Sequence, residues 1–98
     1  MKSEQNRENR ETAVSLEYDV KKDKAPRITA KGRGKLAERI IALAREHNIP
    51  IKSEPELVQV LYQLDLESEI PPALYRVVAE IFAFVYSLNK EWANRKGA

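Results

Sequence analysis

The sequence predicts an α/β fold in which a small mixed β-sheet of about three strands packs with three helices. Residues 12–18 alternate apolar and polar side chains, which is typical of a half-buried strand. Residues 25–51 have the order strand, glycine corner, helix, strand, and two further amphipathic helices follow near 54–64 and 72–88. A strand–helix–strand unit with short connections normally gives parallel strands with the helix lying on the sheet.

The composition limits both the size of the protein and the functions open to it. A chain of 98 residues makes one domain at most. It has no cysteine, which excludes disulfides and thiolate metal sites. Its 17 basic and 15 acidic residues are interspersed and give a net charge of +2. No one-signed patch results, so the charge pattern does not favour a nucleic-acid binder.

The chain is expected to consist of a polar tail, one domain and a second tail. Residues 1–11 are polar and charged after the first methionine, so we expect a disordered segment that is neither a signal peptide nor a membrane span. Residues 12–90 form the predicted domain, and the basic residues 91–98 are expected to fray from its last helix. The expected location is the cytoplasm, and contact with a membrane is expected only through a partner.

The first two predicted strands are joined by a charged loop. In the strand near 12–18, one face carries the larger apolar side chains. Residues 21–24 are charged and long enough to reverse the chain. Pro26 cannot donate a hydrogen bond to a sheet, so it is expected at the start of the second strand, near 27–31, or on an edge.

A helix is expected after the second strand, at residues 35–47. Gly32 and Gly34 form the corner that leads into it, where a positive φ favours glycine. Apolar residues then recur on one helical face, at positions 36, 37, 40, 41 and 44. Asn48 suits the left-handed residue that ends a helix, and a short third strand is predicted near 49–52.

Two more helices complete the predicted domain. Residues 53–56 have the capping-box pattern with a proline in the first turn, and this helix is expected to end near Leu64. The last helix, near 72–88, is apolar on more than its core face. Ala79 and Phe82 belong to this surplus apolar surface, which either packs under the first strand or stays exposed as a partner site.

Three polar features are candidates for chemistry, and each has a structural interpretation. Residues 31–35 resemble a phosphate loop but lack its spacing and its hydroxyl, so nucleotide or anion binding is only an alternative. His47, the one histidine, suits a capping role near a helix C-terminus. The acidic residues at 65–69 lack the glycine and spacing of a calcium loop. We therefore expect no catalytic residue, no metal and no cofactor.

Five segments of the chain, taken together, resemble one family. They are AVSLEYD, APRITAKG, LAERIIALAREHNIPI, LVQVLYQLDL and EIPPALYRVVAEIFAFVY. In this order they are similar to the cytoplasmic domain of the FlhB-type export-switch proteins of flagella and type III secretion systems. The likeness covers about residues 12–88, which is nearly the whole predicted domain.

Two departures from the family pattern bear on the expected function. Family members carry a large membrane-spanning half, which this sequence does not contain. They also carry an Asn-Pro-Thr-His motif before the AVSLEYD strand, where the chain cleaves itself. Residues 8–11 are Glu-Asn-Arg-Glu here, so no self-cleavage is expected. The strand that precedes the motif in the family is replaced by the polar tail, which would leave the 12–18 strand with a free edge.

The resemblance implies a non-enzymatic binding module of the export apparatus. It would substitute for, or assist, the C-terminal part of the export-switch protein in recognising substrates. A family surface for early substrates corresponds to four residues, named here the substrate patch: Ala25, Pro26, Ala79 and Phe82. The implied partners are the export gate, the membrane half of the switch protein and N-terminal segments of export substrates, without nucleic acid or membrane insertion. The alternative is a regulatory protein that sequesters an export component or a substrate.

Overall fold

The computed structural model describes residues 11–19 and 21–84. Its elements are, in order, β2 (Thr12–Glu17), β3 (Arg27–Arg33), α1 (Lys35–Glu46), α2 (Pro55–Tyr62) and the 3₁₀ turn η1 (Pro72–Leu74). A last helix follows η1 directly and occupies residues 75–84 of the described range. Nearly all of the polar tail expected at 1–11, the end of the last helix and the basic tail expected at 91–98 lie outside the described residues.

The sheet is a two-stranded antiparallel ribbon in the described part of the chain. The register runs from Thr12 opposite Arg33 to Glu17 opposite Arg27. It shifts at a bulge in β3, where Thr29 is the extra residue opposite the step from Ser15 to Leu16 of β2. Both strands lie where the alternating pattern and the β-branched residues of the sequence predict them.

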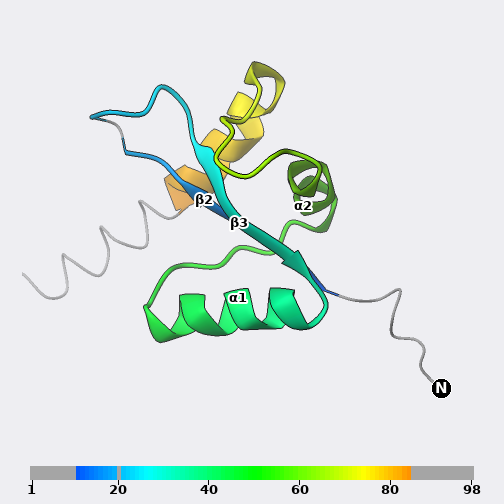
Figure 1. The fold of residues 1–98 in the computed structure, drawn as a ribbon. Coiled ribbons are helices and arrows are strands. Elements are labelled where there is room, and N and C mark those ends of the chain that lie inside the picture. The colour runs from blue at the N-terminus through cyan, green and yellow to red at the C-terminus, as the bar shows by residue number, and fades with distance from the viewer. Residues whose placement is uncertain (1–10, 20, 85–98) are drawn as a thin grey trace, which may run out of the picture.

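Helices cover both faces of this ribbon, as Figure 1 shows. The helix α1 lies along one face, and α2 and the last helix lie on the other. The apolar core is on the α2 side and consists of Ile28, Leu57, Leu61, Ile70 and Val78. Burial of one such aliphatic side chain contributes roughly 1.5–3 kcal/mol of transfer free energy. Because β3, α2 and the last helix all supply residues, this cluster fixes their relative positions.

The face that α1 covers is built from small residues. Ala13 on β2, its cross-strand partner Gly32 on β3, and Ala37 on α1 are all buried. A Cβ on Gly32 would lie only 2.5 Å from Cγ of Leu36. Gly34, in contrast, has φ 62°. The positive φ expected for this corner is therefore found at Gly34, whereas Gly32 permits the close approach of α1.

The helix α1 ends as the sequence predicts. Asn48 has φ 58°, and its N–H donates to the carbonyl of Arg45 at 3.1 Å. The N–H of Ile49 donates to the carbonyl of Ala44 at 2.8 Å. This pair of bonds is the Schellman arrangement, which satisfies carbonyl groups that a helix end would otherwise leave without partners.

The third strand and the parallel crossover are corrections to the sequence analysis. Residues 49–52 have no strand conformation, so this segment forms no parallel pair with β3. The antiparallel pairing of β2 with β3 agrees with the chain reversal expected at residues 21–24. Pro50 has no N–H to give to a ladder, and the described residues place no neighbouring strand beside this segment. The α/β class and the three helices are confirmed.

The start of α2 also differs from the prediction. Its N-cap is Glu54, without a side-chain cap bond, and Pro55 is its first residue. Ser53 therefore lies one position too early to form a capping box. Among residues 11–19 and 21–84, no helix has the length and apolar character needed to cross a membrane.

Candidate partner-binding site

The four residues of the substrate patch lie at different depths in the structure. Ala79 is exposed, Pro26 and Phe82 are half-buried, and Ala25 is only 2% exposed. Phe82 packs against the apolar core and still keeps part of its ring accessible. A partner at this surface would therefore touch Pro26, Ala79 and Phe82, while Ala25 supports the chain beneath them.

Two contacts lie near these residues: one joins Pro26 to the segment before η1, and the other joins the end of β2 to the last helix. The N–H of Ile70 donates to the carbonyl of Pro26 at 3.0 Å. The rings of Tyr18 and Phe82 lie 6.0 Å apart with a tilt of 55°. Tyr18 is 39% exposed, so it adds an aromatic face to the substrate patch. Tyr18 continues the alternating apolar pattern of Val14 and Leu16, but it lies just beyond the end of β2, which accounts for its exposure.

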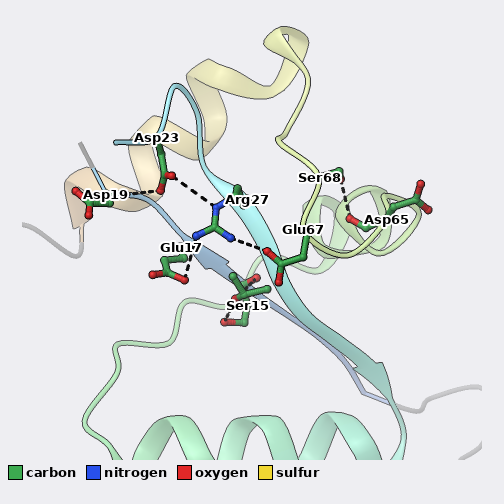
Figure 2. A network of polar contacts seen from close by, with 9 residues as sticks. Ser15, Glu17, Asp19, Asp23, Arg27, Asp65, Glu67 and Ser68 are labelled. Carbon is green, nitrogen blue, oxygen red and sulfur yellow. Dashed lines mark hydrogen bonds and ion pairs between the residues drawn. The ribbon is translucent and has the colours of Figure 1, made fainter. Parts of the chain in front are cut away.

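Arg27 holds the loop before β3 in place, as Figure 2 shows. Its guanidinium lies 2.6 Å from a carboxylate oxygen of Glu67, 3.5 Å from one of Glu17 and 3.7 Å from one of Asp23. The other carboxylate oxygen of Asp23 accepts the N–H of Asp19 at 2.8 Å. One side chain thus ties β2, the β2–β3 loop and the turn before Ile70 together next to Pro26.

Two of the three basic residues of the apparent phosphate loop, Lys31 and Arg33, point to α2. Nζ of Lys31 donates to the carbonyls of Tyr62, at 3.0 Å, and Leu64, at 2.7 Å, which lie at the C-terminal end of that helix. The guanidinium of Arg33 stacks over the Tyr62 ring, with its carbon 4.1 Å from the ring centroid. These contacts give both side chains structural partners and do not favour the nucleotide-binding alternative.

The other polar candidates also have structural partners. Nδ1 of His47 lies 2.9 Å from the carbonyl of Leu43, which fits the predicted capping role. Glu67, in the acidic turn, is the partner of Arg27 and has φ 67°. Among the described residues, no group of three or more histidine or carboxylate side chains is arranged to hold a metal ion.

A groove of about 630 Å³ runs along β2, and sequence analysis did not find it. Its extended walls are residues 11–16 and residues 49–55, and it is further lined by side chains of α1, α2 and the last helix. We call it the β2 groove. Ile49 and Ile51 on its wall are 56% and 43% exposed. Phe82 lines the groove and also belongs to the substrate patch, so the two surfaces are continuous.

Exposed apolar side chains are the feature that these two surfaces share. They consist of aromatic and aliphatic side chains next to a strand, and Arg27, Glu67 and Lys31 nearby are engaged in an ion pair or a helix cap. Apolar anchors on a shallow surface give specific but reversible binding. A surface of this kind can hold a peptide segment.

Comparison with known proteins gives one consistent family. Residues 9–85 match the family described as "FlhB HrpN YscU SpaS Family". The chain is 45% identical over 84 residues to protein YlqH of Bacillus subtilis (strain 168), which covers 86% of this chain and 90% of that protein. It is 41% identical over 81 residues to the flagellar biosynthetic protein FlhB of Salmonella typhimurium, covering 82% of this chain and 21% of that protein. The chain thus spans about a fifth of that relative's length.

Solved structures confirm the fold. The cytoplasmic domain of FlhB from Shewanella putrefaciens has a TM-score of 0.73 and 41% identity, with 76% of this chain and 63% of that chain covered. The PscU C-terminal domain has a TM-score of 0.71 and 26% identity, with 74% of this chain and 94% of that chain covered. The resemblance derived from the five sequence segments is confirmed by both kinds of comparison.

Proposed function

Because the chain belongs to the FlhB HrpN YscU SpaS Family, we propose that it is a binding module of the flagellar or type III protein export apparatus. The observation that carries this proposal is the extent of the match, from residue 9 to residue 85, which includes every described element. In this role the chain replaces or assists the C-terminal part of a larger FlhB protein, at the cytoplasmic side of the membrane where export components hold it.

The finer part of the proposal concerns substrates. The N-terminal segments of export substrates bind at the substrate patch, through Pro26, Ala79 and Phe82, with Tyr18 beside them. Support comes from the exposed aromatic and aliphatic atoms at this place and from the Arg27 ion pairs that fix the adjoining loop. A short amphipathic or extended signal could place one or two apolar side chains there.

The test is secretion of a hook-type substrate by a strain whose FlhB lacks the region that matches this chain. We expect the wild-type chain to restore secretion and Ala79→Asp to reduce it at least tenfold, because a carboxylate would have to be desolvated against the apolar signal. Ala42→Asp is the matched control, since Ala42 is also an exposed helical alanine but lies on α1.

Two results would count against the proposal. Failure of the wild-type chain to restore secretion, although it is folded and present at normal level, contradicts a replacing or assisting role. If the chain also binds an export component under those conditions, the sequestering alternative is supported instead. Equal secretion with Ala79→Asp and Ala42→Asp would show that the substrate patch does not bind substrates. The proposed role in export would be unaffected.

A further inference from the structure

The loop between β2 and β3 separates charges that the sequence mixes. Its residues 19 and 21–24 comprise two aspartates and three lysines. One carboxylate oxygen of Asp19 accepts the N–H of Lys21 at 2.9 Å. Asp23 accepts the N–H of Asp19 and lies beside the Arg27 guanidinium, as Figure 2 shows, and its side chain is only 11% exposed. Both acidic side chains are therefore engaged with the loop itself or with Arg27.

The three lysines of the loop are on its outside. Lys21, Lys22 and Lys24 are all exposed, and we call them the lysine tip. Within residues 11–19 and 21–84, none of their ammonium groups takes part in an ion pair, a hydrogen bond or a cation–π contact. The accessible charge of the loop is thus mainly positive, although its composition is nearly balanced.

The backbone that carries the lysine tip is held in one conformation. The carbonyl of Asp19 accepts the N–H of Lys22 at 3.1 Å and the N–H of Asp23 at 2.8 Å. Arg27 fixes the far end of the loop through its contact with Asp23. A ligand that binds the lysines therefore does not have to order the loop, and the entropic cost of binding is smaller.

The lysine tip adjoins the substrate patch in the chain. Tyr18 directly precedes the loop and Pro26 follows it, so that Lys24 is only two residues, at most about 7 Å of chain, from Pro26. Two exposed carboxylates of this region, on Glu17 and Glu67, contact the Arg27 guanidinium and balance its charge. An incoming carboxylate is therefore attracted to the lysine tip rather than to Arg27.

We propose that the lysine tip binds acidic side chains of an export substrate while apolar side chains of the same segment occupy the substrate patch. The inference names the substrate class of the proposed function and rests on it. The preferred segment has a carboxylate two or three residues from its apolar anchor, because two residues of an extended peptide span about 7 Å. A lysine or arginine at that position would be repelled, so the tip also selects against basic segments.

The expected effect is moderate and depends on salt. Exposed ion pairs contribute little individually, and three of them together change a Kd by roughly three- to tenfold. Charges at the rim of a binding surface act mainly on the association rate and on specificity. Both effects decrease as salt shortens the screening length.

The experiment measures the Kd of the full chain for three synthetic versions of the N-terminal segment of a hook-type export substrate. The versions carry Glu, Gln or Lys at the positions two and three residues from the apolar side chains. At about 0.05 M salt, we expect the Glu version to bind about three- to tenfold more tightly than the Gln version, and the Lys version to bind most weakly. At about 0.5 M salt the three Kd values should converge.

A charge-matched pair of variants locates the effect. In the triple variant Lys21→Gln, Lys22→Gln and Lys24→Gln, the preference for Glu over Gln should disappear while the Gln version binds as before. The control replaces three exposed basic residues of α1, which lies on the opposite face of the ribbon from the last helix, and should keep the preference: Lys35→Gln, Arg39→Gln and Arg45→Gln.

The outcomes separate this inference from the proposed function. Equal Kd values for the Glu and Gln versions, or the same preference in the tip variant and in the wild type, would overturn the inference and leave the proposed function standing. A polyglutamate peptide without apolar residues that binds as tightly as the Glu version would overturn it as well, because the tip would then be a general polyanion surface. If no version binds at millimolar concentration, both the inference and the proposed substrate recognition are contradicted.

Discussion

Arg27 joins three separate segments of the chain next to Pro26. Its guanidinium has three carboxylate partners from three separate segments, and its side chain is only 25% exposed. Asp23, one of these partners, is 11% exposed and would keep a nearly buried charge if the cation were removed. The other two carboxylates are largely exposed, so water screens their contribution.

We predict that Arg27→Met lowers the free energy of unfolding by about 1–2 kcal/mol, chiefly through the loss of the Asp23 partner. The loss should shrink in high salt, which screens the pairs in the wild type. Urea unfolding of both proteins measures it. Lys52→Met is the control, because it removes one ion pair, with Glu54, between side chains that are 39% and 40% exposed, and one cation–π contact with the Phe84 ring. A loss no greater than in the control would show that the network has no structural role.

At the level of single residues, the sequence predicted backbone conformations more accurately than tertiary contacts. Asn48 and Gly34 have the positive φ expected from their types and positions, since such preferences are local. The burial of Ala25 and the close approach of Leu36 to Gly32 depend on elements that fold against them. The local amino-acid pattern around these residues does not indicate those tertiary contacts.

Among the elements, α1 is attached to the sheet mainly through small residues. Ala37 is its one buried residue in the structure, whereas Leu36 is 53% exposed and Leu43 is 48% exposed. The predicted apolar face of α1 is therefore only partly covered. The helix is held at short distance over Gly32 and Ala13, where added volume cannot be accommodated without a shift.

We predict that Gly32→Ala destabilises the protein by about 1–3 kcal/mol, because its new Cβ would meet Leu36 at 2.5 Å from Cγ. In the double variant with Leu36→Ala, two of the three closest atoms are removed, and much of the loss should be recovered. A double-mutant cycle in urea measures this coupling. Strictly additive effects would contradict the packing described for α1.

The element that the sequence analysis placed wrongly is the strand at 49–52. Its alternation of apolar residues is a real strand pattern, but a strand forms only when another strand pairs with it. Helices satisfy their backbone groups internally, and for this reason all three were predicted near their observed positions. The sequence therefore predicted the positions of the helices, whose hydrogen bonds are local, but not the absence of a pairing partner for residues 49–52.

At the scale of the whole molecule, the family likeness and the surface features point to the same role. The five segments that suggested the family are distributed over every described element, and the match from residue 9 to residue 85 confirms it. The substrate patch and the β2 groove meet at Phe82, so one ring takes part in both surfaces. We therefore expect the protein to act by binding peptide segments at this junction.

The most direct test of that claim is an amide NMR titration of the full chain with the N-terminal segment of a hook-type export substrate. The account predicts signal shifts at Ala25, Ala79, Phe82 and Tyr18 that saturate with added peptide. It predicts no saturating shifts on the exposed face of α1 around Ala42. Absence of shifts at the substrate patch at high peptide excess would contradict the claim that this surface recognises export substrates.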